Sequence, residues 1–374
     1  MKRVVLTGNG LSVALNKDFG LESITKRFFG RLNDEHKSFI KHHMKDNYNQ
    51  RDFEEAIASI ELSYETLKHY SNFLNLENGK HFMNSYSLSN ENFKEHLEAI
   101  QNIIYEYTAS ILELIDGNVK KDEIDNKLDE FVKWLVDVIE DSTEIDLFTL
   151  NFDLLLETIL LTYFNSKDFA DFHYRGNKWT PINDEYRYFF GPDRSKQIHP
   201  ENYKKNVRLH HLHGSLSSFK DLSDGKLFKV TTGSLRFSDL YKKIFDLNVI
   251  PSIVTGGGKS LKVQQEPFNF YYNEFKKKMI VDEQMCEELY IIGYSFRDAH
   301  INKAIAERLA ETRKKENPKP LKILIVDYAS NEDAKKKFVD RVNIELKIPK
   351  KQAFSINDER ILFGGANSIS LLKV

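Results

Sequence analysis

The 374-residue sequence has a single cysteine, Cys286, and no long apolar run. One cysteine excludes an internal disulfide and a zinc module built from cysteines, and it is typical of a reducing cytoplasm. The longest apolar run, residues 158–164, is far shorter than the roughly 20 residues that a membrane span needs. The first residues turn to glycine and asparagine too early for a secretory signal. We therefore expect a soluble cytoplasmic protein that does not bind membranes.

The sequence also lacks an excess of charge of one sign. It has 54 Lys and Arg against 56 Asp and Glu, which gives a net charge of −2. Such a balance creates no global field that favours nucleic acid, so we expect no direct, sequence-specific nucleic-acid partner. Hydrophobic residues make up 41% of the chain, which is enough for a sizeable core and for more than one structural unit.

The spacing of apolar residues changes along the chain. Residues 2–7 and 145–150 read as buried strands, and a helix is expected over 153–164. Residues 21–142 carry apolar stripes spaced by three and four, which is typical of helices that face a core. Further strands are expected at 207–212, 250–254, 289–292 and 321–326, in a parallel sheet, with a hairpin through 227–232, whereas 165–205 read as irregular. Helices are expected near 269–282, 298–313 and 331–342.

This alternation predicts an α/β fold: a Rossmann-like, doubly wound parallel sheet with a large all-helical insertion after the first βα unit. The predicted Rossmann domain comprises residues 1–20 and 143–330. The helical insertion comprises residues 21–142, and residues 331–374 form a C-terminal extension of helix and strand.

Small and polar residues directly follow the predicted strands. Because ligands of open parallel sheets bind beyond the carboxyl ends of the strands, these residues are the candidates for a binding site. They are Gly8, Asn9, Gly10 and Ser12 after the first strand, Thr149, Asn151 and Asp153 after the second, and His213, Gly214, Gly293, Ser295 and Asp327 after later ones.

Each of these signals has a second interpretation. Gly8 and Gly10 suit either a tight turn or a phosphate cradle, since Val13 stands where a dinucleotide fingerprint has its third glycine. Asn151 and Asp153 can cap the helix that follows, and Asp298 is expected to cap its own helix. No paired cysteine or carboxylate spacing accompanies the histidines at 210–213, so we predict no metal site.

Four segments together resemble the sirtuin family. Residues 8–12 (GNGLS) resemble the G-A-G-x-S loop, residues 149–153 (TLNFD) resemble T-Q-N-x-D, and residues 212–215 (LHGS) resemble the His-Gly segment. Residues 293–301 are similar to the G-Y-S-F-x-D-x-x-I signature of bacterial sirtuin-like proteins that are linked to phage defence and act as NAD hydrolases. Two departures stand out: Asn9 replaces alanine, and the four zinc-binding cysteines of sirtuin deacetylases are missing, which argues against protein deacylation.

The resemblance implies a role for each candidate residue. Asn151 and His213 would be catalytic: the amide would orient a ribose hydroxyl or the attacking water, and the imidazole would accept a proton. Asp153 would polarise the ribose or fix the Asn151 loop. Gly8, Gly10 and Ser12 would cradle the phosphates of NAD and Asp327 would receive the adenosine ribose, while the remaining NAD-binding candidates are Asn9, Thr149, Gly214, Gly293 and Ser295. NAD would be a substrate, and no zinc would be needed.

The resemblance therefore predicts an NAD glycohydrolase that yields nicotinamide and ADP-ribose and depletes NAD in abortive infection by phage. The alternatives are an NAD-dependent deacylase or ADP-ribosyltransferase, and a non-catalytic subunit that senses NAD or ADP-ribose. A homo-oligomer is expected, and a separately encoded HerA-type ATPase or another phage-sensing protein is the hypothesised partner.

Overall fold

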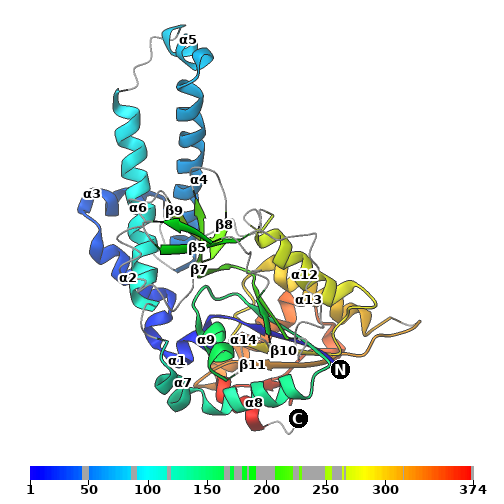
Figure 1. Ribbon diagram of the computed structural model, residues 1–374. Coiled ribbons are helices and arrows are strands. Elements are labelled where there is room, and N and C mark those ends of the chain that lie inside the picture. Colours follow the sequence, from blue (N-terminus) through cyan, green and yellow to red (C-terminus); the bar gives the residue numbers. More distant parts are fainter. Residues whose placement is uncertain are drawn as a thin grey trace. The chain divides into compact units, whose positions relative to one another are not determined.

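The computed structural model (Figure 1) describes residues 1–43, 50–85, 91–115, 119–163, 169–171, 179–182, 185–190, 207–221, 227–229, 249–254, 263–264, 267–314 and 316–371. By its internal contacts the chain divides into two compact units. The first comprises Met1–Gly20, Ile115–Val254 and Ser260–Val374, and the second comprises Leu21–Leu114 and Thr255–Lys259. No helix of the described residues is long and apolar enough to cross a bilayer.

A seven-stranded parallel sheet forms the centre of the first unit, in the order β12-β11-β10-β1-β2-β6-β3. Its strands are β1 (Lys2–Thr7), β2 (Glu144–Thr149), β3 (Phe169–Asp171), β6 (Val207–His211), β10 (Glu288–Ile292), β11 (Lys322–Val326) and β12 (Ile361–Leu362). The chain builds the sheet outward from β1 in one direction through β2 and β6, and then in the other through β10, β11 and β12. This order is that of a doubly wound sheet, whose two halves meet between β1 and β10.

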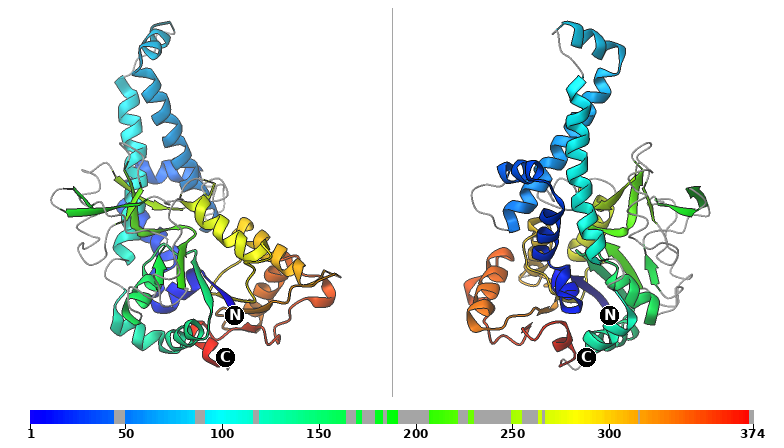
Figure 2. Two further views of the ribbon diagram at one scale, coloured as in Figure 1. Left: turned by 45° about the vertical axis from the view of Figure 1, so that its right-hand side comes forward. Right: turned by 90° about the vertical axis from the view of Figure 1, so that its left-hand side faces the viewer.

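Helices cover both faces of this sheet. In Figures 1 and 2 the green helices α8 and α9 lie on one side of it, and the orange helices α13 and α14 lie on the other. The helices of the unit are α1 (Asn9–Leu15), α7 (Lys121–Lys127), α8 (Asp129–Glu140), α9 (Leu155–Tyr163), α12 (Phe268–Ile280), α13 (Ala299–Glu311) and α14 (Glu332–Glu345), with 3-10 helices η1 (Lys17–Phe19), η3 (Lys350–Gln352) and η4 (Ala366–Leu371). The predicted fold class is confirmed.

A second, antiparallel sheet has the order β4-β5-β8-β7-β9. Its strands are β4 (Trp179–Ile182), β5 (Glu185–Phe190), β7 (Gly214–Asp221), β8 (Leu227–Lys229) and β9 (Val249–Ile253). The predicted hairpin is confirmed for β7 and β8, which pair antiparallel, and residues 230–232 of the prediction lie outside the described residues. The prediction that residues 250–254 join the parallel sheet is wrong, because β9 pairs antiparallel with β7. A short apolar run does not indicate which sheet the strand will join. Pro251 does indicate an edge strand, which β9 is, because proline cannot donate a backbone hydrogen bond.

Two further segments differ from the sequence interpretation. Residues 165–205, expected to be irregular, contain β3, β4 and β5. Residues 119–142, assigned to the insertion by their helical spacing, form α7 and α8 of the first unit. The apolar stripe of α8, which includes Phe131, Leu135 and Val138, is buried in that unit.

The second unit is helical, with α2 (Leu21–Arg31), α3 (Asp34–His43), α4 (Gln50–Leu74), α5 (Glu77–Ser85) and α6 (Glu91–Ile115). The long helices α4 and α6 lie side by side in all three views (Figures 1 and 2). Ile57 and Ile60 on α4 and Ile111 on α6 are fully buried, so the predicted stripes do face a core.

Candidate active site

The turns that follow β1 and β10 pack directly on each other where the two halves of the sheet meet. The N–H of Gly8 donates to the carbonyl of Ile292 at 2.9 Å, and that of Gly10 donates to the carbonyl of Gly293 at 2.8 Å. A Cβ on Gly10 would lie 2.6 Å from the Cα of Gly293, and Gly293 itself has φ +63°. The glycines are therefore required by this backbone contact, and the N–H groups of Gly8 and Gly10 are already used within the protein.

Asn151 is fixed at the carboxyl end of β2 by its own amide. Its Nδ2 atom donates to the carbonyl of Gly8 at 2.9 Å and to Oγ of Ser12 at 2.7 Å. Because a carbonyl only accepts, these contacts establish which side-chain atom is the nitrogen. Both amide hydrogens are used, so the Oδ1 atom is the part of this side chain left to accept a hydrogen bond from a ligand.

Ser12 and Asp153 form the support of Asn151. The hydroxyl of Ser12 accepts from Asn151 and donates to Asp153 Oδ2, while Oδ1 of Asp153 accepts the backbone N–H of Leu155 at the start of α9. Burial raises the pKa of the Asp153 carboxyl, against the opposing effect of the Ser12 hydrogen bond. Ser12 is fully buried, so its hydroxyl acts here as a link between two side chains.

The Asn151 and His213 loops are neighbours. β2 and β6 pair in register through Thr149 and His211, so Asn151 and His213 each lie two residues beyond the same pair. The N–H of Leu212 donates to the carbonyl of Thr149 at 2.9 Å, and that of Leu216 donates to the carbonyl of Phe152 at 2.8 Å. The side chain of Thr149 also accepts the N–H of Asn151 at 3.0 Å.

His213 lies in the short turn between the parallel and the antiparallel sheet. Gly214, which follows it, has φ +84°, and a Cβ there would lie 2.1 Å from the carbonyl of Ser252. The carbonyl of His213 accepts the N–H of Val254 at 2.7 Å. Gly214 is therefore required by the sharp reversal of the chain, which fixes the backbone that carries His213.

The loop after β10 brings a carboxylate to His213. The Nε2 atom of His213 lies 4.0 Å from Oδ1 of Asp298, and both side chains are more than nine-tenths buried. The rings of His213 and His300 lie 6.2 Å apart between centroids. Asp298 is the N-cap residue of α13 as predicted, and its carbonyl accepts the N–H of Asn302 at 3.0 Å, but its side chain makes no capping hydrogen bond. Sequence reasoning missed its proximity to His213, which no spacing in the chain reveals.

Asp327 and Ser295 lie at the ends of β11 and β10. Burial raises the pKa of Asp327 to about 6, against the opposing effects of the Tyr328 N–H and the Arg341 charge. Nη1 of Arg341 donates to the carbonyl of Ser295 at 3.3 Å, and the Ser295 residue is exposed. These residues, like Asn9 at the exposed start of α1, lie at the predicted edge of the sheet, and their roles toward a ligand stay predictions.

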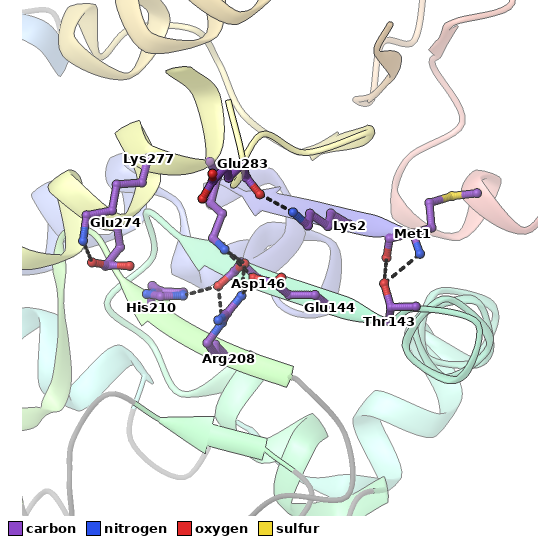
Figure 3. Close-up of polar contacts among 11 residues, drawn as sticks. Met1, Lys2, Thr143, Glu144, Asp146, Arg208, His210, Glu274, Lys277 and Glu283 are labelled. Carbon is purple, nitrogen blue, oxygen red and sulfur yellow. Dashed lines mark hydrogen bonds and ion pairs between the residues drawn. The ribbon is translucent and has the colours of Figure 1, made fainter. Parts of the chain in front are cut away.

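Figure 3 shows a different polar cluster, around the first residues of β2 and β6. The Asp146 carboxylate contacts Arg208 at 2.7 Å and His210 at 2.8 Å, and Lys278 at 3.1 Å. Arg208 and Lys278 also bind Glu144. The His210 ring is fully buried and stacks on Phe148, so this histidine is part of the core. In the described part of the chain, no three His, Cys, Asp or Glu residues are arranged to hold a metal ion.

The fold and this edge of polar side chains define a doubly wound α/β protein with its candidate site at the carboxyl ends of β1, β2, β6 and β10. A family model described as the SIR2-like domain matches residues 146–347, which is more than half of the chain. The chain belongs to the SIR2-like domain family, and this membership supports an NAD-related activity.

No curated protein matches the chain. A solved structure described as "The Structural basis of Sirtuin Substrate Affinity" aligns over 89% of this chain and 85% of that chain, with 11% sequence identity and a TM-score of 0.36.

Proposed function

We propose that this protein hydrolyses the bond between nicotinamide and ribose in NAD. The observation that carries the proposal is the fixed Asn151 amide, whose two hydrogens are held by Gly8 and Ser12 and whose Oδ1 can accept a hydrogen bond at the carboxyl edge of the sheet. His213 follows the adjacent strand at the equivalent position. An amide acceptor and an imidazole that follow adjacent strands suit a reaction in which a water molecule must be oriented and deprotonated.

The reaction requires few further groups from the protein. Water attacks C1′ of the ribose, the C1′–N bond breaks, and its electron pair moves to the ring nitrogen of the cationic nicotinamide, which leaves as a neutral molecule. No general acid is needed, unlike in O-glycoside hydrolysis. Asn151 orients the water or a ribose hydroxyl, and His213 takes the proton, so the products are nicotinamide, ADP-ribose and one proton.

Incubation of the purified protein with NAD alone, with nicotinamide and ADP-ribose measured, tests this proposal. We expect release without any acyl or protein acceptor, and a fall of about 10²–10⁴-fold in His213→Ala and Asn151→Ala. His96→Ala and Asn75→Ala change exposed residues of the helical unit and serve as matched controls. Release that requires an acceptor would favour deacylation or ADP-ribosyl transfer. Binding of NAD without turnover would favour the sensor, and full activity in His213→Ala would contradict the assigned base.

The proposal extends to the biological role. The similarity of residues 293–301 to the late signature of phage-defence proteins supports a cytoplasmic homo-oligomer that depletes NAD during infection. A HerA-type ATPase or another phage-sensing protein would then restrain it. Cellular NAD measured after phage challenge, with His213→Ala as the control, distinguishes this role from a constitutive activity.

A further inference from the structure

The carboxylate of Asp298 does not form the helix-capping hydrogen bond that its position suggests. Asp298 is the residue before α13, where an aspartate normally accepts a backbone N–H of the first turn. Its side chain makes no such bond, and Oδ1 lies 4.0 Å from Nε2 of His213 instead. The helix start therefore forgoes the capping hydrogen bond while a buried acid faces a buried histidine.

The loop that carries Asp298 is held by two buried side chains. The hydroxyl of Tyr294 accepts the N–H of Asp298 at 3.2 Å and lies 2.8 Å from Oδ1 of Asn302. Asn302 in turn donates to the carbonyl of Phe296 at 3.0 Å and to Glu345 of α14 at 3.1 Å. Phe296 is fully buried at φ +55°, a conformation that a bulky residue rarely adopts.

Such strain persists only where the surroundings fix the backbone, and it is frequent at functional sites. Here the fixed backbone is the one that sets the direction of the Asp298 carboxylate. The loop held by Tyr294, Phe296 and Asn302 thus places the Asp298 carboxylate beside His213. The packing of these three residues does not itself require a carboxylate there.

We propose that Asp298 is a positioning residue that holds the His213 imidazole through its Nε2 edge and keeps the ring ready to accept a proton. An N–H at Nε2 leaves the opposite ring nitrogen as the acceptor, and a carboxylate beside it stabilises the imidazolium that forms. The separation of 4.0 Å is that of an ion pair, and such contacts tighten when substrate is bound.

Among the described residues, α13 and α12 also bring titratable groups near this pair. His300 is the second titratable group that faces His213, and Tyr272 of α12 packs on His300 at 5.2 Å between ring centroids. Burial raises the pKa of Tyr272, so this phenol is neutral. His211 lies on the same strand as His213, and Arg297 next to Asp298 is exposed. Asp298 is the acid within ion-pair distance of His213 among the described residues.

The test measures the His213 ring directly. In protein with ¹³C-labelled histidine, the ring signal that disappears in His213→Gln is followed against pH in the wild type and in Asp298→Asn. Since the carboxylate stabilises the imidazolium, we expect the midpoint to fall by about one pH unit in Asp298→Asn. Asp298→Glu should keep part of the difference, and Glu332→Gln, an exposed acid at the start of α14, should change nothing. An unchanged midpoint in Asp298→Asn overturns the inference.

The kinetic readout rests on the proposed function. Because the neutral imidazole accepts the proton, activity rises with pH through this midpoint. In Asp298→Asn the acidic limb should therefore move to lower pH by about one unit, while kcat falls about 10–100-fold and KM for NAD changes little. A fall in kcat with no movement of the limb would indicate only a structural role.

The two hypotheses fail in different ways. A wild type that releases no nicotinamide contradicts the proposed function, whereas the ring titration needs no turnover and judges Asp298 by itself. If Asp298→Asn does not fold, Tyr294→Phe replaces it. This variant removes the hydroxyl that holds the Asp298 backbone and should give a smaller fall of the same midpoint, and an unchanged midpoint there again overturns the inference.

Discussion

The pKa values of buried acids are shifted in opposite directions at the two ends of the parallel sheet. At the amino ends of the strands, burial disfavours the Asp146 carboxylate, but the His210 hydrogen bond and the charges of Arg208 and Lys278 hold its pKa below the usual value. At the carboxyl ends, no cation contacts the buried carboxyl of Asp153 among the described residues, and burial raises its pKa. The pKa of Asp327 is raised to about 6 by burial as well.

This difference separates a structural from a functional use of the same residue types. Ion pairs at the amino end link residues of β1 and β10, and residues of β2, β6 and α12, so the buried charges there are compensated within the protein. A buried acid without a cation beside it, and an amide whose oxygen has no hydrogen-bond donor, lie in an unfavourable environment. A bound molecule can supply the missing partner. In a doubly wound sheet the ligand end is the carboxyl end, so the contrast follows the direction of the strands.

The largest expected effect comes from breaking the amino-end cluster. Asp146→Asn removes the buried carboxylate and leaves the partly exposed Arg208 and the buried Lys278 with Glu144 as their remaining acid, so the free energy of unfolding at pH 7 should fall by about 3 kcal/mol. Because the folded pKa of Asp146 lies below the unfolded one, this stability is present above about pH 4 and is lost as the pH falls further. Denaturant unfolding at pH 7 and pH 3 measures it. Asp129→Asn, an exposed acid of α8, is the control, and an equal loss at both pH values would contradict the expectation.

A carboxyl-end acid should respond in the opposite direction. The folded pKa of Asp327, about 6, lies above the unfolded value of 3.8, so its ionised form destabilises the fold above pH 6 and has no such effect below about pH 4. Asp327→Asn should therefore stabilise the protein by about 1–3 kcal/mol at pH 7.5 and by nothing at pH 4. Thermal unfolding at the two pH values measures this. A rise in KM for NAD in the same variant would support the predicted ribose contact, whereas destabilisation at pH 7.5 would show that the charge is compensated.

More of the carboxyl end of the sheet than of the amino end can be predicted from the sequence. The strand pattern and the rule that ligands bind beyond the carboxyl ends predicted that Asn151, His213 and Gly293 lie at one edge of the sheet, and each of them follows the end of a strand of the parallel sheet. A residue directly after an apolar run needs no tertiary information to be placed. The Asp146 cluster needs three elements distant in sequence, so no local pattern indicates it.

The same limit applies to the partners of individual side chains. The start of a helix predicts a phosphate contact for Ser12, and only the folded chain shows that its hydroxyl also binds Asn151 and Asp153, whose positions depend on the pairing of β1 with β2. Asp298 looked like a helix cap because capping is a local rule, and only the folded chain shows His213 opposite it. Local rules predict which elements form, whereas side-chain partners depend on the tertiary packing.

The smallest expected loss of unfolding free energy comes from an exposed ion pair at the amino end of the sheet. Arg3 contacts Glu288 and Asp141, both at 2.6 Å, but the Glu288 side chain is 8% exposed and that of Asp141 is 63% exposed. In Asp141→Asn the guanidinium keeps Glu288, the carbonyl of Val138 and the hydroxyl of Ser142, so unfolding should lose less than about 1 kcal/mol. Glu288→Gln, which removes the buried charge, should cost several times more in the same denaturant titration. Equal losses of unfolding free energy in both variants would mean that burial does not determine how much an ion pair at the amino end stabilises the fold.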